Sequence, residues 1–171
     1  LEAEGLVVQR SPRVTVVADV SLDQIRDLFA VRRALEESAA RLAAARLAAP
    51  RAHVDRTPFA ALADAFERSD ATDDVDAYYA RVAQLDAAIA STVANDFLAR
   101  ALQPVRAHLG RVRRLASDRP ERLRASSAEH ALIARAIAAG DGDLAAHAPH
   151  VHLHHALASV ELALADDATG R

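Results

Sequence analysis

Apolar residues recur every three or four positions along most of the chain, and that spacing predicts amphipathic helices. The first helix is expected from about Ser21, a good capping residue, to Leu47, shortly before Pro50. Five further helices are expected at about 57–68, 74–94, 95–117, 117–140 and from 143 into the 160s. Six such segments with short connections predict an all-α fold, an antiparallel bundle of about six or seven helices.

The first twenty residues follow a different pattern. A short helical end, LEAEG, precedes two β-type runs, LVVQR and VTVVA, which Ser11 and Pro12 separate. Two such runs around a turn predict a small hairpin. We therefore expect three parts: residues 1–20, a helical unit over 21–166, and a disordered tail over 167–171.

Composition narrows the class of protein. Half of the 171 residues are hydrophobic but only 4% are aromatic, which favours closely packed helices over a sheet. The absence of cysteine excludes disulfides and thiolate metal sites, and the net charge of −3 argues against a general nucleic-acid surface. No run approaches the roughly 18 apolar residues that span a bilayer, and no secretory signal opens the chain. We expect a cytoplasmic protein without a membrane partner. The start at Leu1 and the lack of methionine predict a fragment of a longer product.

Four polar residues fall on the apolar stripes of different predicted helices: Arg32, Asp86, His130 and His152. Buried polar groups need partners, because an unpaired buried charge costs several kcal/mol or more. Their inward direction predicts a shared polar cavity. Arg32 has two interpretations, an internal ion pair with Glu36 or an arginine that binds an anion.

The two histidines also leave alternatives open. Each is either a satisfied core residue or a ligand. Two imidazoles and a carboxylate are a usual set for zinc, nickel, iron or manganese, so Asp86, His130 and His152 are a candidate metal site. The neighbouring histidines at 147, 150 and 154 are assigned no role.

Three segments stand out along the chain: QIRDLFAVRRALEESAARLAA at 24–44, VAQLDAAIASTVAN at 82–95 and EHALIARAIAAGDGDLAAHAPHVHL at 129–153. In this order they resemble the FCD effector-binding domain of the FadR-type branch of GntR transcription regulators. The opening stretch, LEAEGLVVQRSPRVTVVA, resembles the end of that family's winged helix-turn-helix, although Val14 stands where the wing usually has glycine. The resemblance implies that 1–20 is the remnant of a DNA-binding domain and that 21–166 binds effector and dimerises.

The resemblance also implies a ligand set. Metal-binding members of the family hold a divalent ion with one aspartate and three histidines at the cavity floor. The second and third histidine positions match His130 and His152, the first carries Asp86, and the aspartate position carries Val82. This implies a metal site of Asp86, His130 and His152 for one divalent ion such as Zn, Ni or Mn. Arg32 matches the family's inward arginine, so the implied effector-binding set is Arg32, Asp86, His130 and His152.

By resemblance, then, the protein is a ligand-responsive DNA-binding regulator, most often a repressor, and not an enzyme. Its implied partners are operator DNA, a small organic acid and a second copy in a homodimer. Two other classes remain: a metal-dependent helical-bundle enzyme, and a helical dimerisation module whose inward polar groups neutralise one another.

Overall fold

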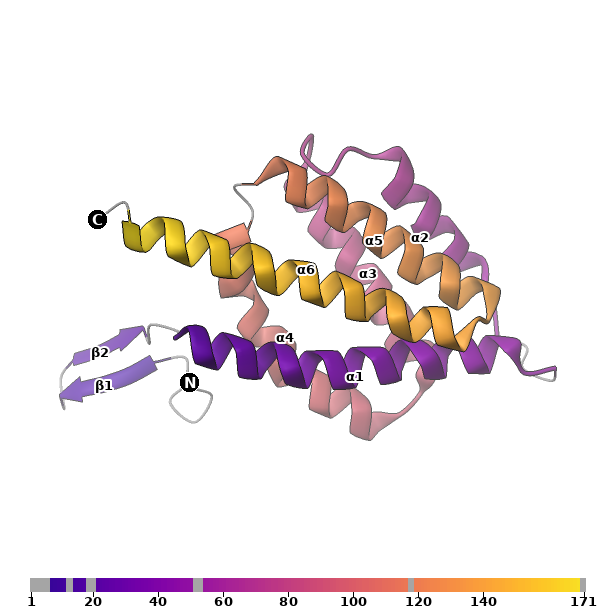
Figure 1. The fold of residues 1–171 in the computed structure, drawn as a ribbon. Helices are drawn as coiled ribbons and strands as arrows, with labels where there is room; N and C mark the ends of the chain where they lie inside the picture. The colour runs from indigo at the N-terminus through magenta and orange to yellow at the C-terminus, as the bar shows by residue number, and fades with distance from the viewer. Residues whose placement is uncertain (1–6, 12–13, 18–20, 51–53, 117–118, 170–171) are drawn as a thin grey trace.

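Six helices make up the body of the chain in the computed structural model, which describes residues 7–11, 14–17, 21–50, 54–116 and 119–169 (Figure 1). They are α1 (Leu22–Ala48), α2 (Thr57–Arg68), α3 (Val75–Val93), α4 (Asp96–Ala116), α5 (Pro120–Ala139) and α6 (Gly142–Thr169). This confirms the predicted all-α bundle. Helix α6 also includes residues 167–169, which the sequence assigned to a disordered tail, whereas 170–171 lie outside the described residues.

Local sequence explains where the helices begin and end. The Ser21 hydroxyl accepts a hydrogen bond from the Gln24 backbone N–H, and the Gln24 side chain accepts one from the Ser21 N–H, a capping box. Helix α5 ends at Gly140, whose φ of +75° is a conformation that favours glycine. A Cβ on Gly140 would also lie 3.1 Å from the Cβ of Ala48, so the turn into α6 needs a glycine for two reasons.

A two-stranded antiparallel hairpin precedes the bundle, as the sequence predicted. Strand β1 (Val7–Ser11) pairs with β2 (Val14–Val17), with Val8 opposite Val16 and an irregularity between Gln9 and Ser11. The expected helical end at residues 1–5 lies outside the described residues.

Within the bundle, α1 and α6 run side by side, and α5 packs against α6, α1 and α2 (Figure 1). The core forms two hydrophobic clusters. The larger contains many alanines, such as Ala43, Ala44 and Ala134, whose small side chains let helices approach closely. The smaller joins the beginning of α1 to the second half of α6, with Ile25, Phe29, Leu153 and Val160.

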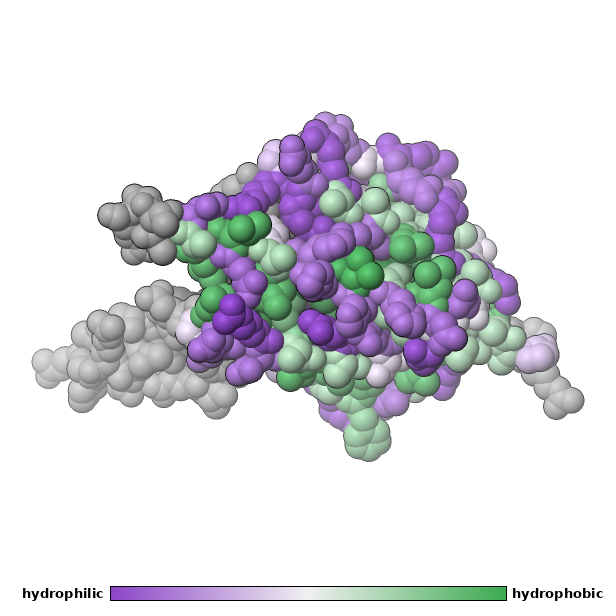
Figure 2. Space-filling model, viewed as in Figure 1, coloured by the Kyte–Doolittle hydropathy of each residue, from purple (hydrophilic) through white to green (hydrophobic). Residues whose placement is uncertain are grey.

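The face of the molecule seen in Figure 2 is mostly hydrophilic, with hydrophobic patches between the polar residues. Exposed large apolar side chains of α6 include Val151 and Leu162, at 46% and 57%. No helix in the described ranges is long and apolar enough to cross a membrane.

Candidate functional site: a polar cavity between four helices

A cavity of about 90 Å³ lies where the two hydrophobic clusters meet. Phe29 and Val160 of the smaller cluster line one part of it, and Tyr78 and Leu123 of the larger cluster line another. The space is enough for several water molecules, each of which needs roughly 10–15 Å³. The other lining residues come from α1, α3, α5 and α6: Arg32, Glu36, Tyr79, Val82, Asp86, Arg122, Ser126, His130, His152 and Ala156.

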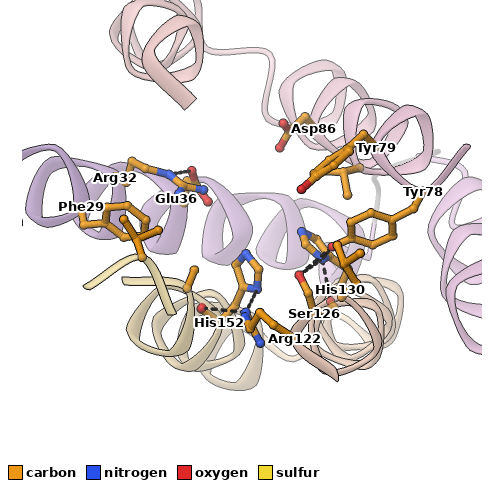
Figure 3. A pocket seen from close by; sticks show the side chains of 14 residues that line it. Phe29, Arg32, Glu36, Tyr78, Tyr79, Asp86, Arg122, Ser126, His130 and His152 are labelled. Atoms are coloured by element: carbon orange, nitrogen blue, oxygen red, sulfur yellow. Dashed lines mark hydrogen bonds and ion pairs between the residues drawn. The ribbon is translucent and has the colours of Figure 1, made fainter. Parts of the chain in front are cut away.

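All four residues that the sequence directed inward line this cavity. Arg32, His130 and His152 are buried, at 7%, 8% and 7% exposure, and Asp86 faces them from α3 (Figure 3). A polar cavity with residues from separate helices is therefore present.

Arg32 shows the internal pair that was one of its two interpretations. Its Nε lies 2.9 Å from Glu36 Oε1, one helical turn along α1, and its guanidinium lies 5.0 Å from the centre of the Phe29 ring. Nε is the only Arg32 atom with a hydrogen bond inside the described part of the chain. Arg32 therefore has donors left for an anion in the cavity, and the ion pair does not exclude the second interpretation.

His130 is held by its own helix and by α3. Its Nδ1 lies 2.7 Å from the Ser126 carbonyl oxygen, which only accepts, so Nδ1 carries a proton. The Tyr78 hydroxyl lies 2.6 Å from Ser126 Oγ and 3.2 Å from His130 Nδ1. The imidazole also stacks on Phe66, with ring centroids 5.4 Å apart. Packing and hydrogen bonding together fix this ring.

His152 lies beside His130, with 4.3 Å between ring centroids. Its Nδ1 is 2.8 Å from Glu129 Oε2. Burial lowers the pKa of His152 below its usual 6.5, although the hydrogen bond and charge of Glu129 oppose that change. The neutral form of His152 is therefore favoured at neutral pH.

Asp86 has a partner that sequence reasoning did not identify. Its Oδ1 lies 3.1 Å from the NH2 nitrogen of Arg106 on α4, and both side chains are 28% exposed. Asp86 and Arg106 also line a smaller hollow of about 30 Å³, which shares Glu36, His130 and His152 with the main cavity. The histidines thus lie between two adjoining spaces.

The residues as they lie do not complete a metal site. His130 and His152 are brought together, but Asp86 is held by Arg106. In the ranges that the structure describes, no three His, Asp or Glu side chains are placed to hold a metal ion. Metal sites with an open coordination position usually have three protein ligands, whereas His130 and His152 supply two. The divalent metal stays a prediction.

Sequence reasoning also missed Arg122 and Glu129 of α5. The NH1 and NH2 nitrogens of Arg122 lie 2.8 and 2.6 Å from the two Glu129 oxygens, and both side chains are nearly buried. A signal was present, because 122, 126 and 130 are four residues apart and share one face of the helix. The histidines at 147, 150 and 154 are exposed, in keeping with the absence of an assigned role.

The profile of the FCD domain matches residues 27–155, three quarters of the chain. The chain therefore belongs to the FCD domain family, whose members are C-terminal effector-binding domains of GntR-family regulators. A search of curated proteins finds no match to the chain. The fold and the polar cavity thus belong to a ligand-sensing regulatory domain, a class found typically in regulators rather than in enzymes.

Proposed function

We propose that the cavity binds a small organic acid and that the domain is the sensory part of a cytoplasmic DNA-binding repressor. The observation that carries the proposal is Arg32, a buried arginine with donors directed at a polar hollow. A guanidinium matches the geometry of a carboxylate with two parallel hydrogen bonds. On the floor, the Nε2 lone pair of His152 accepts a hydrogen bond from a ligand hydroxyl.

Charge balance supports an anionic ligand. Each acidic side chain on the cavity lining already has a cationic partner: Glu36 pairs with Arg32, and Asp86 pairs with Arg106. His152 is favoured as neutral and adds no charge. A ligand carboxylate can therefore accept hydrogen bonds from the Arg32 nitrogens that Glu36 does not use. These charge-assisted hydrogen bonds offset the free-energy cost of burying the carboxylate.

Regulation requires that the ligand prefer one arrangement of the protein over another, because equal affinity for both would shift nothing. In the proposal, two copies form a homodimer, and the hairpin at 7–17 is the end of a winged domain that binds operator DNA. Occupancy of the cavity changes the relative placement of the paired winged domains. Val14, where the wing usually has glycine, then alters the turn of the wing but not the sensing site.

The experiment is a thermal-shift and calorimetric screen with acetate, lactate, malonate, succinate and citrate. A binding acid at 100 times its Kd adds about 2.7 kcal/mol to the free energy of unfolding and raises Tm. Arg32→Gln abolishes the shift, whereas Arg41→Gln, which changes an exposed arginine of the same helix, preserves it. If no acid binds, or if both variants bind equally, the proposal fails.

Two further measurements bear on the rest of the proposal. With the full-length protein, a binding acid changes operator affinity, and unchanged affinity would contradict the regulatory role. Titration with Zn²⁺, Ni²⁺ and Mn²⁺ tests the predicted metal at Asp86, His130 and His152. Turnover of an acid in the presence of a metal would instead favour a metal-dependent enzyme.

A further inference from the structure

Glu129 lies behind the cavity floor and gathers four hydrogen bonds there. It is absent from the cavity lining, and its side chain is 15% exposed. Its carboxylate accepts two bonds from Arg122, one from His152 and one from His155, at 2.6–2.8 Å. A carboxylate with this many partners has few alternative positions.

The contact with His152 determines where that imidazole carries its proton. An ionised carboxylate only accepts, so at 2.8 Å the Nδ1 of His152 must donate. In the neutral ring the lone pair is then on Nε2, the nitrogen on the other side from Glu129. Arg122 also only donates, so its NH2 nitrogen, 3.4 Å from the same Nδ1, is a neighbour of His152 and not its hydrogen-bond partner.

The carboxylate is held as an acceptor at both oxygens, because Arg122 donates one hydrogen bond to each. Burial alone would raise the pKa of Glu129, but hydrogen bonds from His152, Arg122 and His155 outweigh it and lower the pKa to about 2. Arg122 also fixes the orientation of the Glu129 carboxylate, because the two parallel hydrogen bonds of a guanidinium hold the carboxylate in its own plane. Arg122 thus orients Glu129, and Glu129 orients His152.

We propose that Glu129 is the positioning residue of the cavity: it holds His152 with its proton on Nδ1, so that the Nε2 lone pair is available to the ligand. A group behind an imidazole that sets its tautomer commonly determines what the ring binds. Without Glu129, no contact of His152 within the described part of the chain prefers Nδ1–H over Nε2–H. The role in ligand binding rests on the proposed function, whereas the tautomer assignment does not.

The test is NMR of protein labelled with [15N]histidine, recorded without ligand at neutral pH. The ring nitrogen shifts and long-range couplings report which nitrogen carries the proton. In the wild type, His152 is expected in the Nδ1–H form. A wild-type spectrum with His152 in the Nε2–H form would overturn the proposal without any variant.

Three variants separate positioning from a structural role. Glu129→Ala is expected to mix the two tautomers of His152, whereas Glu129→Gln, whose amide oxygen still accepts, restores Nδ1–H. His155→Ala removes an exposed partner of the same carboxylate and leaves the tautomer as in wild type. The His130 ring, bound to a backbone carbonyl, is an internal reference that stays unchanged.

Affinity for whichever acid of the screen binds gives the second readout. Glu129→Ala is expected to weaken it about tenfold, with recovery in Glu129→Gln. An unchanged tautomer in a folded Glu129→Ala protein, or full affinity with mixed tautomers, would contradict the positioning role. If no acid binds even the wild type, the proposed function fails but the tautomer result still decides the assignment of Glu129.

Discussion

The two halves of α5 face different surroundings. Its C-terminal half is fully apolar where it is buried, with Ile133, Ala134 and Ile137 at 5%, 0% and 0% exposure. Its N-terminal half presents Arg122, Ser126 and His130 to the cavity. One continuous helix thus contributes both to a close-packed core and to a polar cavity.

The difference follows from side-chain size and chemistry. Alanines at buried positions let neighbouring helices pack without gaps, and a close-packed region has no space for a ligand. Around the N-terminal half, long polar side chains pair with one another and leave space between the pairs. We therefore expect substitutions in the C-terminal half to change stability, and substitutions in the N-terminal half and around the cavity to change recognition.

The largest expected effect is on the apolar half. Ile137→Ala removes a fully buried side chain and should lower the free energy of unfolding by about 3 kcal/mol, since it leaves a cavity. Leu132→Ala on the same helix is the control, because Leu132 is 45% exposed and should cost much less. Urea denaturation measures both. Equal losses would mean that this half is not the close-packed part.

Next in size is the acid sensitivity contributed by Glu129. Its folded pKa of about 2 lies below its unfolded value of 4.5, so its stabilisation is present above pH 4.5 and is lost as the pH falls towards 2. The depressed pKa of His152 acts in the same direction below pH 6.5.

Glu129→Gln should therefore be less stable at pH 7, and its loss of stability between pH 4.5 and 2 should be smaller. Asp70→Asn is the comparison, because the pKa of Asp70 is also lowered to about 2 by its hydrogen bonds with Arg124 and Thr72, but Asp70 lies at the surface. Denaturation at a series of pH values compares the two slopes. If Asp70→Asn flattens the profile more, the buried network is not the main acid-sensitive element.

At the cavity, Arg32→Lys should separate recognition from stability. Lysine keeps the positive charge beside Glu36 but loses the fork that matches a carboxylate. We expect the free energy of unfolding to change by less than about 1 kcal/mol. Affinity for the acid should fall about tenfold, which corresponds to the loss of one charge-assisted hydrogen bond. Calorimetry and urea denaturation measure the two quantities. Unchanged affinity would show that only charge at this position matters.

The smallest effect is expected for Tyr78→Phe. The variant removes the hydroxyl that lies 2.6 Å from Ser126 Oγ and 3.2 Å from His130 Nδ1, but it keeps the buried ring. The free energy of unfolding should fall by about 1 kcal/mol, the net value of one buried hydrogen bond. A loss as large as that of Ile137→Ala would mean that the polar region also carries the main stability of the bundle.

The fold was predictable from the sequence because helical spacing and end signals are local. Ser21, Pro50 and Gly140 each mark a helix end, and the resemblance placed the helices in a known order. Arg32, His130 and His152 were also predictable as inward residues, because each interrupts an otherwise apolar stripe.

The partners of these residues were not predictable in the same way. Glu129 precedes His130 in sequence and resembles an ordinary surface residue; only the packing of α6 on α5 buries it with His152. Asp86 of α3 meets Arg106 of α4, a contact that neither helix indicates alone. Which side chains of different helices pair depends on tertiary packing, and the periodicity of a single helix does not predict it.

The most direct test of the ligand site is an NMR titration of the [15N]histidine-labelled and [15N]arginine-labelled protein with the acid that binds best. We expect saturable shifts of the His130 and His152 ring nitrogens and of Arg32 Nε, with the exposed His147 and His150 unchanged. Shifts confined to the exposed histidines, or none at Arg32, would contradict a binding site in the cavity.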